Sequence, residues 1–242
     1  MAGLKNKIAV VTGASGGIGE SIAYALARNR VDLCLLGRDE SKLERLSGRL
    51  GKIHSEVQTY VCDFASADNI HSVAKKINSD FRAIDILVHS AGSLMLKSLE
   101  EITEAEFDLE FAVNTRAPFL LTKLLLPAIK NRKGQIVFLN SSIAQQKARA
   151  NLSIYAGSKY ALRAIADSLR EEVNASEVRV LSVYPGRTAT AMQEDIFKFE
   201  NREYRKNQLL QPEDIAQSVI DALALPRTAE ITDISIRPFK KF

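Results

Sequence analysis

The chain has no tryptophan and few cysteines: its 242 residues include only Cys34 and Cys62. Two cysteines form at most one disulfide, which excludes a small fold stapled by several bridges. Both lie in apolar runs that we predict to be strands, so we expect buried, reduced thiols in a cytoplasmic protein. Three scattered histidines and two cysteines show no ligand spacing, and we therefore expect no metal site.

Long apolar runs and charge runs are also missing. The most apolar segment, 119–129, is interrupted by Lys123 and Pro127, and it is shorter than the ~18 residues of a membrane span. The start of the chain leads directly into a short apolar run, which does not resemble a signal peptide. The net charge of +4 is spread along the chain, without five or six consecutive basic residues. We expect neither a membrane nor a nucleic acid as partner.

Short apolar runs alternate with amphipathic segments, which predicts repeated βαβ units and a mainly parallel sheet. The fold class is therefore α/β, a Rossmann-type doubly wound three-layer sandwich in a single domain over 1–242. The predicted strands are 7–12, 31–36, 56–62, 85–89, 135–140, 178–184 and 230–236. The predicted helices are 17–29, 40–50, 66–78, 103–111, 114–130, 153–173 and 212–223.

A charged stretch over 186–210 has no clear strand or helix pattern. It exceeds the usual loop length of ~4–6 residues, and such segments often cover binding sites. We predict an irregular segment with a substrate-binding lid at about 187–210. The alternative is an amphipathic surface helix whose charges are solvated.

A glycine-rich turn, Thr12-Gly-Ala-Ser-Gly-Gly-Ile-Gly19, joins the first strand to the first helix. Gly13 permits a backbone angle that a side chain disfavours, Gly17 allows the main chain to approach a pyrophosphate, and Gly19 allows close packing of the helix on the sheet. The helix N-terminus offers free N–H groups to phosphates. The alternative, a flexible connector, is disfavoured because the turn follows a strand and opens a helix.

Arg38 follows the second strand, where an acidic residue would favour NAD(H). A guanidinium donates two parallel hydrogen bonds to a phosphate, so we predict NADP(H). The alternative is that Arg38 is a solvated surface charge. Asp39 is interpreted as the N-cap of the next helix. Asp63, after the third strand, either binds an adenine amino group or caps a turn.

Tyr155 and Lys159 are four residues apart on a predicted helix, so they share one face. A cation beside a phenol lowers the phenol pKa from its usual ~10, which would allow acid or base catalysis at neutral pH. Each residue also has a plain interpretation: an interface tyrosine and a solvated lysine. Likewise, Ser142 and Asn114 could simply cap a turn and a helix.

Taken together, these residues resemble the short-chain dehydrogenase/reductase family over nearly the whole chain. The resemblance rests on the ordered motifs Thr12-Gly-x-x-x-Gly-x-Gly19, Ala91-Gly92, Asn114, Ser142, Tyr155-x-x-x-Lys159 and Pro185-Gly186. Ser142 precedes Tyr155 by 13 residues, the separation usual in the family, which disfavours Ser141. The resemblance implies a seven-stranded sheet in the order 3-2-1-4-5-6-7.

The resemblance also implies a role for each matching residue. Tyr155 would be the general acid and base, and Lys159 would lower its pKa and bind the nicotinamide ribose. Ser142 would position the substrate carbonyl, and Asn114 would hold a water that links Lys159 to solvent. The expected NADP(H) contacts are Gly13, Ser15, Gly17, Ile18, Gly19, Arg38, Asp63, Ala91, Gly92, Asn114, Tyr155, Lys159, Pro185, Gly186, Thr188 and Thr190.

One departure from the family pattern is His89-Ser90, which stands where the family usually has Asn-Asn. A histidine makes similar hydrogen bonds between neighbouring strands, so we interpret His89 as structural rather than catalytic.

The sequence thus predicts an NADP(H)-dependent oxidoreductase that acts on a carbonyl or secondary alcohol, either a carbonyl reductase or a hydroxy-acid or alcohol dehydrogenase. A nicotinamide-nucleotide sensor or scaffold that has lost catalysis is the alternative. A nucleotide-sugar epimerase is disfavoured because only about 55 residues follow Gly186. We expect a small-molecule substrate and a homodimer or homotetramer. Helices 114–130 and 153–173 resemble the family's dimer-forming pair, but part of their apolar surface must face the sheet, so the sequence leaves the interface unassigned.

Overall fold

The computed structural model describes residues 3–53 and 56–240, so Met1 and Ala2, part of the start considered for a signal peptide, lie outside it. Seven parallel strands form one sheet in the order β3-β2-β1-β4-β5-β6-β7, which confirms the predicted fold class. The strands are β1 (Ile8–Thr12), β2 (Asp32–Gly37), β3 (Val57–Val61), β4 (Ile86–His89), β5 (Gln135–Leu139), β6 (Arg179–Pro185) and β7 (Asp233–Ile236). The α-helices are α1 (Gly17–Arg28), α2 (Glu40–Leu50), α3 (Ala67–Asp80), α4 (Glu104–Phe111), α5 (Ala117–Lys130), α6 (Ser153–Val173), α7 (Ala191–Phe199) and α8 (Pro212–Leu223).

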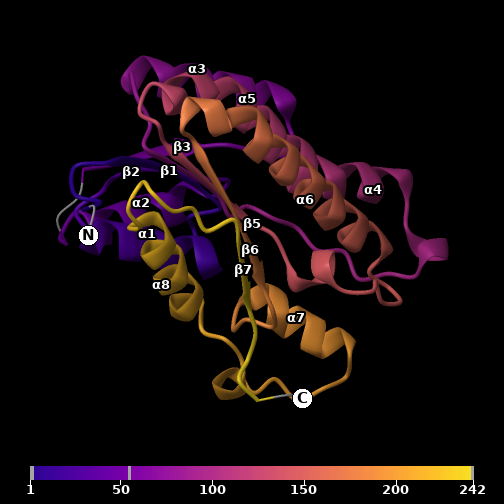
Figure 1. The fold of residues 1–242 in the computed structure, drawn as a ribbon. Coiled ribbons are helices and arrows are strands. Elements are labelled where there is room, and N and C mark those ends of the chain that lie inside the picture. The colour runs from indigo at the N-terminus through magenta and orange to yellow at the C-terminus, as the bar shows by residue number, and fades with distance from the viewer. Residues whose placement is uncertain (1–2, 54–55, 241–242) are drawn as a thin grey trace.

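Helices cover both faces of the sheet (Figure 1). Successive strand residues point to opposite faces, and β1 shows the consequence. Ala9 and Val11 are buried in a core with residues of α1, α2 and α8, whereas Val10 is buried with residues of α3, α5 and α6. Both faces of the central strands are apolar, so each strand is an almost continuous hydrophobic run.

The strand order reverses between β1 and β4. From β1 the chain builds outward to β2 and β3, and it then returns to place β4 on the other side of β1. The connections that leave β1 and β4 therefore diverge at the carboxyl edge of the sheet, which is where open α/β sheets bind ligands.

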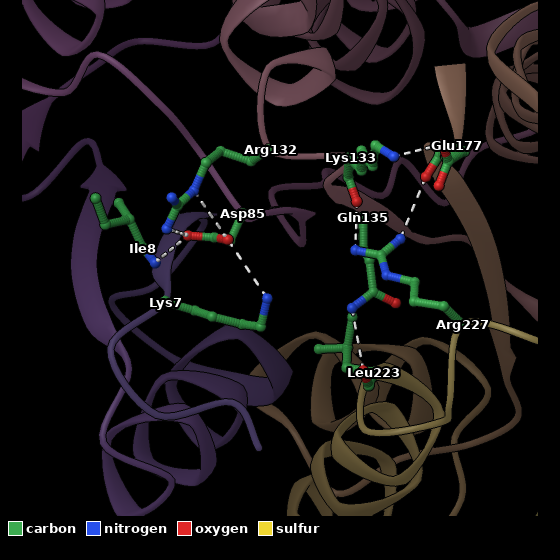
Figure 2. Close-up of polar contacts among 9 residues, drawn as sticks. All are labelled: Lys7, Ile8, Asp85, Arg132, Lys133, Gln135, Glu177, Leu223 and Arg227. Carbon is green, nitrogen blue, oxygen red and sulfur yellow. Dashed lines mark hydrogen bonds and ion pairs between the residues drawn. The ribbon is translucent and has the colours of Figure 1, made fainter. Parts of the chain in front are cut away.

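Polar contacts tie the opposite, amino edge of the sheet together (Figure 2). The Asp85 side chain, which is 4% exposed, directly precedes β4 and accepts a hydrogen bond from the Ile8 backbone N–H at 3.0 Å. Its carboxylate also pairs with Lys7 at 3.4 Å and with Arg132 at 3.3 Å. One buried carboxylate thus links β1, β4 and the turn before β5.

The helices predicted at 103–111 and 114–130 form one helical path rather than two separate helices. A π-helical turn, Ala112–Arg116, joins α4 to α5 without a break. Such wide turns occur inside α-helices and often lie at functional sites. This turn could not be predicted from the sequence, because an extra residue within a helix leaves the local composition unchanged.

The prediction that 186–210 is irregular is wrong in part, because the segment contains helix α7 and a 3-10 turn, Lys206–Gln208. The Thr190 side chain caps α7 by accepting a hydrogen bond from the Gln193 N–H at 3.3 Å. Phe197 is buried in a small core with Ala189 and Leu209. The base of the segment is closed by a parallel bridge between Thr188 and Leu210.

Cys34 and Cys62 are both buried and free, as the sequence analysis predicted. Burial raises the pKa of both thiols, that of Cys62 to about 12, so neither is a reactive thiolate at neutral pH. Over the described ranges, the search for a helix long and apolar enough to span a bilayer found none.

Candidate active site

A cleft of about 1210 Å³ opens at the carboxyl edge of the sheet. It is larger than a typical pocket for one small molecule, ~300–1,000 Å³, and so has room for a ligand of dinucleotide size with a second molecule. Its walls include most of the residues selected from the sequence: Gly13, Ser15, Gly17, Ile18, Arg38, Ala91, Gly92, Ser142, Tyr155, Lys159, Pro185, Gly186, Thr188 and Thr190.

The glycine turn is shaped so that side chains would collide with backbone. A Cβ atom on Gly13 would lie 2.7 Å from the Ala91 Cα, and Gly13 has φ +64. A Cβ on Gly19 would lie 2.4 Å from the Gly13 carbonyl oxygen. Gly17, with φ +55, leaves the start of α1 open toward the cleft and faces Thr190 across it. The turn therefore exposes backbone N–H groups, as a phosphate site requires.

Positive charge gathers beside this turn. Arg38 is exposed at the end of β2 and lines the cleft together with Ser15 and Lys42. In the chain as described, Arg38 takes part in no ion pair, so its guanidinium is available for an anion. Lys42 was not selected from the sequence, although its place one turn into α2 puts it near Arg38.

The two carboxylates near this end have capping roles. Asp39 accepts a hydrogen bond from the Lys42 backbone N–H at 2.9 Å and is the N-cap of α2, as interpreted from the sequence. Asp63 is exposed and accepts a hydrogen bond from the Ala65 N–H at 3.0 Å. Because Asp63 does not line the cleft, the structure favours the capping alternative over contact with an adenine.

Asn114 lies in the π-helical turn and is 1% exposed. Its amide oxygen accepts a hydrogen bond from the Ser93 N–H at 2.9 Å, and its amide nitrogen donates to the Ser93 carbonyl at 3.0 Å. The same nitrogen lies 2.8 Å from the Glu110 carboxylate and 3.1 Å from the Ser158 hydroxyl. These contacts fix Asn114 between the loop after β4 and helix α6, but at the edge of the cleft rather than on its wall.

Tyr155 and Lys159 lie on one face of α6, with the Lys159 ammonium 5.9 Å from the centre of the Tyr155 ring. Lys159 is 4% exposed and donates to the Leu139 carbonyl at 3.2 Å. Burial lowers the pKa of Lys159 to about 8, and the negative charge of Glu110 opposes this change. The pair thus enters the cleft from the helix side.

The expectation that the Tyr155 pKa is lowered is wrong for this structure. Burial raises the pKa of the phenol, a hydrogen bond with the Ser141 side chain opposes this change, and the Glu110 charge adds to it. Removing the phenolate from water is costly, and this effect is larger than the opposing effect of the Ser141 hydrogen bond. Tyr155 is therefore a protonated phenol at neutral pH, which is the form of a general acid.

The Ser141 side chain is the serine that acts on the Tyr155 pKa, which it lowers through a hydrogen bond. Ser141 follows Asn140 at the end of β5, and its hydroxyl also accepts a hydrogen bond from the Ile143 N–H at 3.3 Å. Ser142 begins the next 3-10 turn, although it too lines the cleft. Both serines thus line the cleft, and Ser142 as the catalytic serine stays a prediction.

Pro185 ends β6, and Gly186 donates its N–H to the Ile236 carbonyl at 2.7 Å. The Thr188 hydroxyl donates to the Gly186 carbonyl at 3.0 Å, and Thr190 caps α7. These residues line the same cleft as Tyr155. Arg187, also not selected from the sequence, lines the cleft and pairs with Glu200 at 2.6 Å.

His89 is buried in the sheet and does not line the cleft. Its Nε2 atom lies 2.7 Å from the Thr122 hydroxyl of α5, and its ring stacks on Phe138 of the neighbouring strand β5 at 4.9 Å. Burial lowers the pKa of His89 to about 3, so the ring is neutral. The structural interpretation of His89 agrees with this placement.

A doubly wound sheet with a glycine turn at one end of its cleft and a Tyr–Lys pair at the other defines an oxidoreductase of the dinucleotide-binding class. The chain belongs to the short chain dehydrogenase family, whose model matches residues 7–201. No group of three or more His, Cys, Asp or Glu side chains suited to a metal was found within 3–53 and 56–240.

Its relatives include uncharacterized oxidoreductases of two staphylococci. The chain is 31% identical to one from Staphylococcus saprophyticus and 30% identical to one from Staphylococcus epidermidis, and each alignment covers 98% of this chain and 100% of the relative. An alcohol dehydrogenase of the archaeon Thermococcus sibiricus, solved with 5-hydroxy-NADP, has a TM-score of 0.89 at 28% identity over 98% of this chain and 99% of its own. A metagenomic short-chain oxidoreductase solved with NADP has a TM-score of 0.85 at 29% identity over 99% and 100%.

Proposed function

We propose that the protein is an NADP(H)-dependent oxidoreductase that transfers hydride between the nicotinamide and a carbonyl or secondary alcohol, as a carbonyl reductase or a hydroxy-acid or alcohol dehydrogenase. The observation that carries this proposal is the convergence of Tyr155, Lys159 and Ser141 in the cleft that begins at the glycine turn. The alternative, a silent nucleotide sensor, would not require a protonated tyrosine, a buried lysine and a serine in one cleft.

The cleft fits NADP(H) on chemical grounds. Its glycine turn would hold the pyrophosphate, since a Cβ at Gly13 or Gly19 would collide with backbone and only glycine keeps the turn open. Arg38 and Lys42, which line the cleft together with Ser15, would hold the 2′-phosphate. The solved relatives that contain NADP or 5-hydroxy-NADP support the same choice.

When bound, the cofactor supplies or accepts the hydride. Tyr155 donates its O–H to the substrate oxygen on which negative charge grows, and this contact is stronger in the transition state than in the substrate. Ser141 donates a second hydrogen bond to the same oxygen. The Lys159 charge then stabilises the phenolate left by proton transfer, because an opposite charge favours the ionised form. Oxidation of an alcohol follows the same path in reverse.

The segment 187–210 would act as the substrate-binding lid. It contributes Thr188, Met192, Ile196 and Phe199 to the cleft, and the bridge between Thr188 and Leu210 closes its base. We assign the assembly to a homodimer or homotetramer. Phe119 on α5 is 48% exposed and Tyr160 on α6 is 42% exposed, so the two expected interface helices carry uncovered aromatic side chains.

Replacing Arg38 with aspartate is expected to lower the preference for NADPH over NADH at least about tenfold. The change removes a charged hydrogen-bond donor, worth ~1.5–3 kcal/mol, and places a carboxylate beside the 2′-phosphate. The measurement is the ratio of dissociation constants for NADPH and NADH, followed by nicotinamide fluorescence.

Arg82→Asp is the matched control, because it makes the same change of charge in the exposed loop before β4, at the amino edge of the sheet. An unchanged ratio in Arg38→Asp, or an equal change in the control, would show that Arg38 does not read the phosphate.

A further inference from the structure

One buried acid next to the candidate active site has no part in the mechanism above. Glu110, the second-last residue of α4, is 1% exposed. A carboxylate this deep is rare unless it is paired, because removing it from water is costly. The two acids before it on α4 differ, since Asp108 is exposed and Glu106 pairs with Lys97 at 2.5 Å.

The partners of Glu110 belong to the active-site cluster. The Asn114 amide donates to its carboxylate at 2.8 Å, and that amide is also held by Ser93 and Ser158. A Cβ placed on Gly92 would lie 3.4 Å from the Asn114 amide oxygen and 3.8 Å from the Lys159 nitrogen. Glu110 therefore bonds the Asn114 amide, whose oxygen lies beside Gly92, as the Lys159 ammonium does.

Three ionisable residues interact in this cluster: Glu110, Lys159 and Tyr155. In the portion of the chain that the structure describes, Glu110 on α4 is the acid that interacts with Lys159, and it also interacts with Tyr155 on the same helix α6. Burial raises the pKa of Glu110, while the Lys159 charge and hydrogen bonds with Asn114, Ser93 and the Met95 backbone oppose that change. Burying either charge alone is costly in free energy. A buried acid and a buried base that lie close together each stabilise the charged form of the other.

We infer that Glu110 is a positioning residue of this site: its carboxylate holds the Asn114 amide and supplies the counter-charge that keeps Lys159 protonated beside Tyr155. The inference rests on the proposed function, since Lys159 acts there through its charge. A glutamine at position 110 would keep an oxygen for Asn114 and remove only the charge. A purely structural role therefore survives Glu110→Gln, and a counter-charge role does not.

The sign of the expected change follows from the electrostatic pairing of the Glu110 and Lys159 charges. Lys159 carries its charge below its pKa of about 8 and loses it as the pH rises through that value. Removing the Glu110 charge withdraws the interaction that favours protonated lysine. The Lys159 pKa should therefore fall further, and the lysine should become neutral at a lower pH.

The test is an NMR titration of the nucleotide-free protein with 13C-labelled lysine, in which the Lys159 signal is identified by its loss in Lys159→Arg. Glu110→Gln is expected to lower the Lys159 midpoint by about 1 pH unit or more, the usual effect of one nearby charge. Glu110→Asp, which keeps the charge, should leave it closer to wild type, and the exposed control Asp108→Asn should leave it unchanged. An unmoved midpoint in Glu110→Gln, or an equal shift in the control, would overturn the inference.

A second measurement needs no variant that could fail to fold. In wild-type protein labelled with 13C-glutamate, the Glu110 carboxyl signal should show a step at the Lys159 midpoint, and a signal without that step would contradict the pairing. In assays, the fall in carbonyl reduction at high pH should move to lower pH in Glu110→Gln. If the NMR midpoint moves but wild-type protein reduces no carbonyl, the proposed function fails and the pairing stands.

Discussion

Tyr155→Phe is expected to reduce turnover at least about 10³-fold while leaving the affinity for NADPH within a small factor of wild type. The phenol is the one protonated acid that we place at the substrate oxygen, and loss of a general acid alone costs ~10²–10⁴ in rate. Phenylalanine keeps the ring and its packing, so the cleft should retain its shape. Steady-state reduction of a carbonyl, followed at the NADPH absorbance, measures the first quantity, and fluorescence titration measures the second.

Tyr24→Phe serves as the matched control, because Tyr24 lies on α1, outside the cleft. It removes one phenolic hydroxyl from the molecule and should leave turnover unchanged. Turnover retained in Tyr155→Phe would contradict the assigned mechanism. Loss of NADPH binding in that variant would show that the substitution disturbs the cleft itself.

Ser141→Ala is expected to lower kcat about 10²-fold, whereas Ser142→Ala should lower it less than about tenfold. Removing one preplaced donor to a developing oxyanion typically costs ~10²–10³ in rate. The two serines are adjacent and both line the cleft, but the Ser141 side chain is the one that lowers the Tyr155 pKa through a hydrogen bond. The two variants are thus controls for each other in fold, burial and chemistry.

Steady-state kinetics on the two variants with one carbonyl substrate decide between the serines. A larger loss in Ser142→Ala would restore the assignment made by counting residues back from Tyr155. Equal losses would mean that both hydroxyls contact the substrate oxygen or its immediate surroundings, contrary to the single contact assigned to Ser141.

The fold was predictable because its strands are short apolar runs and its helices have separate apolar faces. Helices α2, α6 and α8 begin and end at the predicted residues, and the sheet order is confirmed. The π-helical turn Ala112–Arg116 was missed, and helix α7 had been predicted only as the alternative to an irregular segment. Both depend on contacts between residues that are distant in sequence. Asn114 accepts a hydrogen bond from the Ser93 N–H, and Phe197 packs in a small core with Leu209.

Gly13, Gly17, Arg38, Tyr155 and Lys159 could be placed in one site from sequence because each has a local chemical reason for its position, and all five line the cleft. Ser141 was disfavoured by its spacing from Tyr155, because which of two adjacent serines faces a phenol depends on backbone direction, which the sequence does not show. The raised pKa of Tyr155 was also unpredictable, since sequence reveals the neighbouring cation but not the depth of burial.

The burial of Glu110 also could not be predicted from the sequence. It lies four residues before Asn114, a spacing that places both on one helix face, and this signal was present in the sequence. A charged residue at that spacing usually faces solvent, and only the packing of α4 on α6 shows that this one does not.

The most direct test of the proposed function is titration of the purified protein with NADPH and NADH, followed by assay of the complex on ketones, aldehydes and keto acids. The chain has no tryptophan, so nicotinamide fluorescence can be followed without an overlapping indole signal. We predict tighter binding of NADPH than of NADH, and turnover of at least one carbonyl compound. If neither nucleotide binds, the assignment of the glycine turn and Arg38 to NADP(H) is wrong.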